Sequence, residues 1–173
     1  MKLIESHMNH KFKDVRVITP IIHRDYRGDL FTTHVKGIRC FWLGGDVEFN
    51  HDKFSTSRKN VLRGIHGDFK SWKLVSCVYG ELYFVLVDNR KDSDTYMEWD
   101  SMILSDKDRK SILIPPGVGN GFLVMSEDSV FSYKWAYNGQ YSDVDEQFTI
   151  KWDDKKLKID WPIDNPILSK RDK

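Results

Sequence analysis

The 173-residue sequence predicts a mostly-β fold, with strands spaced as in a sandwich, a jelly roll or a small barrel. Short runs rich in Val, Ile, Phe, Tyr and Trp recur between turn signals such as Gly, Asp-Asn and Pro-Pro. No long stretch keeps the 3.6-residue apolar period of an amphipathic helix. The best helix candidates, residues 52–59 and 99–106, are short, so we expect an all-β protein with a few short helices.

Two segments indicate where strands should end. Residues 75–85 are typical of two strands that meet near Gly80, because glycine can adopt the turn conformation. Residues 112–114 should form a strand that ends at Pro115 and leads, through a tight turn, into a further strand at Phe122. In a closed barrel, turns of this kind often line a mouth that could hold a small ligand.

The length and the sequence order predict one domain. The chain is long enough for one real core and too short for two comfortable ones, and no repeat or Pro/Gly/Ser-rich linker divides it. We therefore treat residues 1–173 as a single domain. Residues 1–10 are expected to be disordered or partly foreign to the natural chain, because Met8 would fit a start that follows seven added residues.

The N-terminus and the cysteines indicate a cytoplasmic protein. The first residues contain neither an apolar core of signal-peptide length nor a small-residue cleavage site. Cys40 and Cys77 both lie among apolar neighbours. They could form a disulfide, but a cytoplasmic location favours two small buried thiols.

The charge balance argues against nucleic acid and membrane as partners. Lys and Arg number 27 against 26 Asp and Glu, which gives a formal net charge of +1 and no global field to attract polyanions. The apolar run at residues 82–87 is far too short to span a bilayer. Any phosphate binding must therefore come from a local cluster.

Three short segments carry candidate chemistry, and each also has an ordinary structural explanation. His66 lies close to a glycine and could act as a general base, with Arg63 as a phosphate ligand. The glycine-rich residues 117–121 would permit close approach to a ligand, or simply form a tight hairpin. Tyr133 could donate a proton, although taken alone it is more typical of a packed aromatic side chain. An acidic residue in a charged tail, such as Asp172, is usually solvated.

The order of the motifs is far more specific than any one of them. RG-I-H, KLV, YGELYFVLVDNR, ILIPPGVGNGF, YK, IDWP and LS-x-x-D follow one another, after D-Y-R-G at residues 25–28. Together they resemble the dTDP-4-dehydrorhamnose 3,5-epimerase family across most of the chain, from about residue 25 to residue 172. The resemblance implies a cupin jelly-roll β-barrel or sandwich, usually dimeric, that needs no metal or redox cofactor.

The resemblance also implies catalytic roles for four residues. His66 would remove a proton beside the 4-keto group of a nucleotide sugar, and Asp172 would hold the other imidazole nitrogen. Tyr133 would deliver a proton to the opposite face of the enolate. Lys73 would stabilise the negative charge that develops on O4.

The implied substrate contacts include one departure that bears on the reaction. Arg63 and Arg27 would bind the diphosphate, and Tyr141 would either stack on the nucleobase or pack at the barrel rim. Asn120 stands where the family usually has a histidine. Asparagine can hydrogen-bond an enolate or a hydroxyl but cannot titrate near pH 7, which would narrow the chemistry, in the extreme case to C3 alone.

Further departures point away from a dTDP-hexose substrate. His51 and Lys53 stand where dTDP-sugar enzymes tend to show Gln and Asn near the nucleotide, Thr32 stands where an acidic residue is common, and Phe84 replaces a frequent Asp. Relatives that act on GDP-6-deoxy-4-keto-heptoses in bacterial capsule pathways resemble this chain better in the segment around Asn120. We therefore favour a GDP-linked heptose over a dTDP-linked hexose.

The ligand pattern argues against a metal-dependent cupin. Such a protein should offer an HxH pair and a further histidine, whereas Gly67 and Asp68 follow His66 here and Asn120 stands in the later segment. We expect no metal and no cofactor, a nucleoside-diphosphate sugar as substrate, and a homodimer.

The sequence is also compatible with two other functions. A cofactor-free nucleotide-sugar 3,4-ketoisomerase would share the fold and the substrate class, but such enzymes tend to place two histidines close together on one strand, where this chain has only His66. A non-catalytic sugar-binding cupin would explain the lost histidine at Asn120, although the ordered set of motif residues counts against it.

Overall fold

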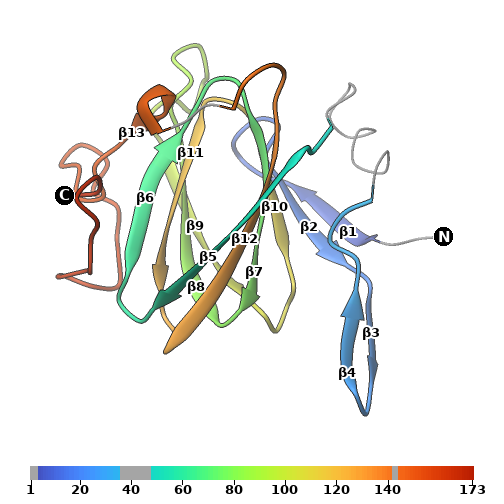
Figure 1. Ribbon diagram of the computed structural model, residues 1–173. Helices are drawn as coiled ribbons and strands as arrows, with labels where there is room; N and C mark the ends of the chain where they lie inside the picture. Colours follow the sequence, from blue (N-terminus) through green and yellow to red (C-terminus); the bar gives the residue numbers. More distant parts are fainter. Residues whose placement is uncertain (1–3, 36–47, 142–143) are drawn as a thin grey trace.

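Two β-sheets pack face to face in the computed structural model, which describes residues 4–35, 48–141 and 144–173 (Figure 1). The first sheet contains, in spatial order, β1 (Ile4–Asn9), β2 (Arg16–Pro20), β10 (Ser111–Ile114), β7 (Trp72–Tyr79), β12 (Asp128–Ala136) and β5 (His51–Arg58). The second contains β13 (Phe148–Thr149), β6 (Leu62–Gly67), β11 (Val118–Val124), β8 (Glu81–Asp88) and β9 (Trp99–Ser105). Every paired strand in the two sheets is antiparallel, as expected for a jelly roll.

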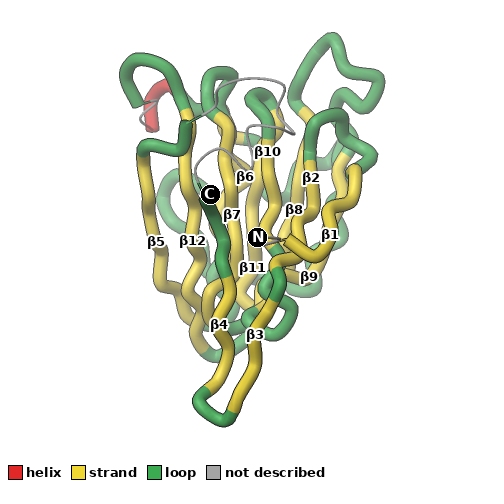
Figure 2. Tube along the Cα trace, turned by 90° about the vertical axis from the view of Figure 1, so that its right-hand side faces the viewer, coloured by secondary structure: helices red, strands yellow, loops and turns green. Residues whose placement is uncertain are grey.

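A separate hairpin extends from this body. It consists of β3 (Ile22–Asp25) and β4 (Gly28–Phe31), which pair with each other and with no other described strand, and which project beyond the sheets (Figure 2). Tyr26 at its tip is 97% exposed and Leu30 is 73% exposed. The hairpin therefore presents apolar side chains that the described part of the chain does not cover.

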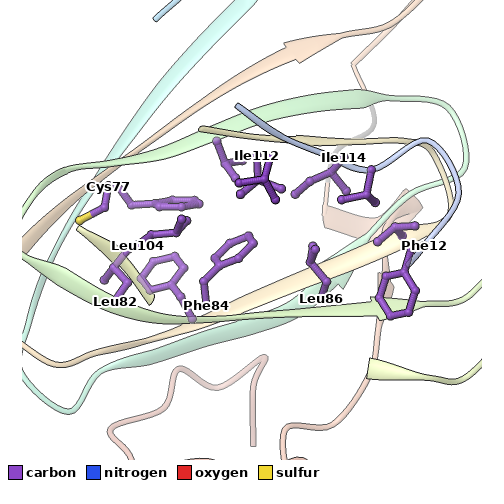
Figure 3. Close-up of a cluster of buried hydrophobic side chains, with 14 of the residues drawn as sticks. Phe12, Cys77, Leu82, Phe84, Leu86, Leu104, Ile112 and Ile114 are labelled. Atoms are coloured by element: carbon purple, nitrogen blue, oxygen red, sulfur yellow. The ribbon is translucent and has the colours of Figure 1, made fainter. Parts of the chain in front are cut away.

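The main core fills the space between the sheets. Phe84 and Leu86 of β8 face Ile112 and Ile114 of β10, and all four side chains are fully buried (Figure 3). Burying a side chain of this size contributes roughly 1.5–3 kcal/mol relative to leaving it exposed.

A second core lies on the outer side of the second sheet. The C-terminal segment, red in Figure 1, covers this side, and its Leu157 and Trp161 pack with Leu62 and Val85. Because β8 is covered on both faces, nearly all of its residues are buried, which explains the continuous apolar run in its sequence.

The expected strand boundaries are confirmed at two turns and wrong at one. Strand β7 ends at Tyr79, β8 begins at Glu81, and Gly80 between them has a φ of +84°. Strand β10 ends at Ile114, as expected. The next strand, however, begins at Val118 rather than at Phe122, so Gly119 and Gly121 lie in a strand and the turn is confined to residues 115–117, where Gly117 has a φ of +84°.

Both helix candidates are strands. Residues 51–58 alternate between half-buried and exposed positions along β5, because this edge strand has one face toward the protein, and residues 99–105 form β9. The one helical element in the described ranges is a 3₁₀ turn, Val144–Glu146. Ile4–Asn9, within the segment for which we expected disorder, pairs with β2.

Cys77 is a buried free thiol on β7, and burial raises its pKa to about 12. Cys40 lies outside the described residues. No helix in the described ranges is long and apolar enough to cross a membrane.

Candidate active site

A cavity of about 310 Å³ opens between the two sheets and collects most of the residues singled out in the sequence. Phe122 of β11 and Phe131 of β12 both line it, and their rings meet across the sheets with centroids 4.5 Å apart. The predicted site residues among its lining are Lys53, Arg63, His66, Lys73, Asn120, Tyr133, Tyr141 and Asp172.

His66 and Asp172 form a close pair on one side of the cavity. The Nε2 atom of His66 on β6 lies 2.8 Å from Oδ1 of Asp172, whose side chain is only 4% exposed. Ser169 donates a 2.7 Å hydrogen bond to the other carboxylate oxygen. The pair leaves Nδ1 as the imidazole nitrogen that can accept a proton from a ligand.

Several donors keep Asp172 ionised despite its burial. Burial by itself would raise the pKa of this carboxyl, but His66, Ser169 and the backbone N–H of Gly64 together lower it below its ordinary value. An ionised carboxylate beside the imidazole stabilises the protonated ring. The pair can therefore accept a proton and hold it.

Glycines bring β6 and β11 unusually close beside this pair. Gly64 has a φ of +113°, and a Cβ atom there would lie 2.5 Å from the Cα atom of Gly121. The register of the two strands shifts at this point, and Asn120 lies directly opposite His66. Asn120 is thus placed in the cavity by a strand, beside the imidazole.

Lys73 enters the cavity from the other sheet. It lies on β7, is only 5% exposed, and its Nζ atom is 4.7 Å from the ring centroid of Trp135. Burial lowers its pKa to about 8, the nearby Asp68 opposes this shift, and Arg171 adds to it. A cation of this kind can stabilise a negative oxygen in the cavity.

Tyr133 lies on β12, between β5 and β7, in register with Lys53 and Val75. Its ring contacts that of Phe131 at 5.6 Å and that of Trp135 at 6.2 Å between centroids. This packing fixes a phenol in the cavity on the sheet opposite to the one that carries His66.

Lys53 and Tyr141 form a cationic and aromatic group at the cavity. The Nζ atom of Lys53 donates a 2.7 Å hydrogen bond to the hydroxyl of Tyr141 and lies 4.2 Å from the centroid of the same ring. The ring of His51 packs on Tyr141 at 4.7 Å, and its Nδ1 is 3.3 Å from the hydroxyl of Tyr137. His51 thus supports this group without lining the cavity itself.

The two predicted phosphate ligands are not brought together. Arg63 lines the cavity and is held by a 2.9 Å hydrogen bond to the hydroxyl of Ser57. Arg27 instead lies at the tip of the β3–β4 hairpin, outside this cavity, and pairs with Asp25.

Several cavity residues were not singled out in the sequence. Arg171 donates hydrogen bonds to Gln147 and Thr149, and Ser169 positions Asp172. Both belong to the same LSKRD motif as Asp172, which is the signal that could have identified them. Gln147 also lines the cavity, and no sequence motif marks it. Among the described residues, no group of three or more His, Cys, Asp or Glu is placed to hold a metal ion.

The arrangement suits proton transfer at a carbon acid. His66, paired with Asp172, faces the cavity from one sheet, and a phenol and a cation come from neighbouring strands of the other; together they could remove a proton, stabilise the resulting oxyanion and return a proton from another direction.

Comparisons with known proteins agree with this chemistry. The family profile described as dTDP-4-dehydrorhamnose 3,5-epimerase matches residues 9–173. The enzyme of that name from Shigella flexneri is 38% identical over 162 residues, which cover 92% of this chain and 88% of the relative.

Solved structures of epimerases share the fold. The dTDP-6-deoxy-D-glucose-3,5-epimerase RmlC of Legionella pneumophila, in complex with dTDP-4-keto-L-rhamnose, superposes with a TM-score of 0.89 at 34% identity, covering 96% of this chain and 89% of that one. NovW of Streptomyces spheroides, a 4-keto-6-deoxy sugar epimerase, gives a TM-score of 0.88 at 30% identity, covering 96% and 84%.

Proposed function

Because the chain belongs to the dTDP-4-dehydrorhamnose 3,5-epimerase family, whose members are isomerases acting on nucleotide sugars, we propose that it inverts C3, or C3 and C5, of a nucleotide-linked 4-keto-6-deoxy sugar. The observation that carries the proposal is the His66–Asp172 pair, which shares one cavity with Lys73 and Tyr133. The product would serve surface polysaccharide biosynthesis.

The reaction begins with removal of a proton beside the keto group. The Nδ1 atom of His66 takes the proton. The electron pair of the broken C–H bond forms a double bond to C4, and the electron pair of the carbonyl π bond moves to O4, which becomes negatively charged. Lys73 stabilises this oxyanion, and Asp172 stabilises the imidazolium. Tyr133 then donates its proton to the opposite face of the enolate, which inverts the carbon.

The nucleotide would lie along the cationic side of the cavity, and we favour GDP over dTDP. Arg63 is exposed and suits the diphosphate. Lys53 is held against Tyr141 at the cavity, where its ammonium group could donate to a nucleobase. Guanine presents two acceptors, O6 and N7, on one edge, and lysine is a pure donor that commonly pairs with them. This favours GDP as the nucleotide, and we keep a 6-deoxy-4-keto-heptose as the proposed sugar, whereas the similar proteins named above are dTDP-sugar enzymes.

We further propose that Asn120 restricts the reaction to inversion of one sugar carbon. An amide opposite His66 can hydrogen-bond a hydroxyl or the enolate but cannot carry a proton near neutral pH. The sugar would therefore be inverted at C3 alone, with His66 retaining the basic step.

The active form is proposed to be a homodimer, with Arg27 acting across the interface. Arg27 lies at the hairpin tip and does not line the cavity of its own protomer, and the described part of the chain leaves Tyr26 and Leu30 of the hairpin exposed. A second copy would cover them and receive Arg27 near its own diphosphate.

The decisive test is NMR of a GDP-linked 6-deoxy-4-keto-heptose incubated with the protein in D₂O, beside a dTDP-linked 4-keto-6-deoxy-hexose. We expect deuterium at C3 of the GDP sugar with inversion of that carbon, and no turnover by His66→Asn. Deuterium at both C3 and C5 would refute the proposal that Asn120 restricts the reaction to C3. Faster turnover of the dTDP sugar would refute the GDP preference, and movement of the keto group to C3 would replace epimerisation with ketoisomerisation.

A further inference from the structure

Asp68 is a buried carboxylate whose charge the reaction described above does not use. It follows β6, two residues after His66, and is only 2% exposed. Its Oδ1 atom accepts hydrogen bonds from the backbone N–H groups of Lys70 and Ser71, at 2.9 and 2.6 Å, and so closes the turn that leads into β7.

The other oxygen of Asp68 has no hydrogen-bond partner in the described part of the chain. This Oδ2 atom is completely buried, and its nearest cation is Nζ of Lys73 at 3.9 Å. Buried acceptors are nearly always satisfied, because an unpaired one costs about 1–3 kcal/mol. An exception beside a predicted catalytic residue calls for a functional explanation.

Lys73 is also unusual for a buried lysine. Within the described ranges its ammonium group makes no hydrogen bond, and its contacts are the Trp135 ring and the carboxylate of Asp68. Its charge is thus balanced at a distance, while its three N–H donors stay available to a ligand. An aspartate in direct hydrogen-bond contact would occupy one of them.

We propose that Asp68 is a positioning residue that keeps Lys73 cationic while leaving its N–H donors free for the oxyanion of the substrate. The inference rests on the proposed function for the identity of that oxyanion, but the electrostatic coupling can be measured without substrate. Because Asp68 also closes the turn before β7, the same side chain fixes where β7 begins and hence where Lys73 stands.

The other charges around Lys73 set the direction of each expected effect. Arg171, from the C-terminal segment, disfavours the ammonium, and Asp68 favours it. The remaining titratable groups that line the cavity are Lys53, Arg63, His66, Tyr133, Tyr141 and Asp172. Removing Asp68 should therefore lower the pKa of Lys73, and removing Arg171 should raise it.

The test is a pH titration by NMR of the full chain carrying ¹³C at the lysine Cε atoms, with the Lys73 signal assigned from Lys73→Met. In the unaltered protein, Lys73 should titrate near pH 8, below the ordinary lysine value of 10.5. Asp68→Asn keeps the Oδ1 acceptor for the turn and removes the charge. It should lower the pKa of Lys73 by roughly one to three pH units, as for a 3.9 Å pair between water-like and surface-like dielectric.

Two further variants make the result specific. Arg171→Gln should shift the titration of Lys73 in the opposite direction. Asp154→Asn, at another turn where an aspartate accepts two backbone N–H groups, should leave it unchanged, because Asp154 does not line the cavity. The role of Asp68 is overturned if Lys73 shows an ordinary lysine titration. It is also overturned if Asp68→Asn and Asp154→Asn change the pKa of Lys73 equally.

The consequence for catalysis has its own readout. The alkaline limb of the kcat/KM profile for deuterium exchange should move to lower pH in Asp68→Asn by the same amount as the pKa of Lys73. A loss of rate that is uniform across pH would overturn the positioning role. Absence of exchange in all proteins, unaltered chain included, would instead overturn the proposed function, and the titration of Lys73 would still decide the coupling.

Discussion

The side chains proposed to exchange protons differ in what surrounds them. His66 is paired with a buried carboxylate, whereas Tyr133 is held by aromatic neighbours. A base needs a partner that stabilises its protonated form, and a phenolic acid mainly needs to be held in place. Substitution of His66 and substitution of Tyr133 should therefore have different effects on proton exchange and on inversion.

Replacement of Tyr133 by phenylalanine should separate proton exchange from inversion. His66 would still remove a proton, but the enolate would regain a deuteron from the same face. We expect formation of the inverted sugar to fall by on the order of 10²–10⁴-fold, with deuterium still entering the unreacted isomer. NMR in D₂O measures both quantities, and equal loss of both would contradict a role for Tyr133 as the acid.

The depressed pKa of Asp172 predicts a pH-dependent stability. Because the folded-state pKa lies below the ordinary value of 3.8, the contribution of this carboxylate is fully present above that value and is lost as pH falls through the lowered pKa. The unaltered protein should therefore lose more stability than Asp172→Asn between about pH 5 and pH 3. Urea unfolding across this range measures the difference, and parallel curves would refute the linkage.

At the scale of the strands, the close approach of β6 and β11 is what places Asn120 beside His66. The approach depends on two facing glycines, Gly64 and Gly121. Strand β11 includes residues 119–121 because its neighbours on both sides supply pairing partners there. The glycine-rich composition of residues 119–121 indicated a turn, but their pairing with β6 and β8 makes them part of a strand.

Gly64→Ala should damage both the fold and the reaction. The new Cβ would collide with the backbone of β11, and φ at this residue is +113°, so we expect a loss of roughly 1–3 kcal/mol in the free energy of unfolding. Gly139→Ala is the matched control, because φ there is +80° and no other atom of the described residues lies within 4 Å of the added Cβ. Chemical denaturation compares the two, and equal losses would show that only φ matters at Gly64.

At the scale of the whole molecule, the sites of the proposed dimer should be composite. Arg27→Ala and His66→Asn should each abolish most turnover alone, yet their mixture should recover it after exchange of protomers. Random assortment makes half of the dimers mixed, each with one intact site, so recovery should approach about a quarter of the unaltered activity. No recovery, with mixed dimers verified by native mass spectrometry, would show that Arg27 does not act across an interface.

The sequence predicted the all-β class from its short strand-like runs, and the family resemblance marked eight of the residues that line the cavity, although not Ser169, Arg171 or Gln147. It could not locate Arg27, whose motif lies on a hairpin outside the cavity of its own protomer. It misassigned residues 52–59 because this edge strand alternates polar and mixed residues without a strong apolar face. The Asp68–Lys73 pair was also missed, since it depends on a turn closed by hydrogen bonds that no motif specifies.

The contact between Phe122 and Phe131 has a consequence for how such proteins can diverge. These rings join the two sheets beside the cavity, and the proposed base and acid stand on opposite sheets. The hydrophobic side chains packed between the sheets therefore set the distance between the proposed base and the proposed acid. Replacing one ring by a smaller or larger side chain would change which carbon of a sugar lies within reach of both groups. The stereochemical outcome can therefore change during evolution while every polar residue of the cavity is retained.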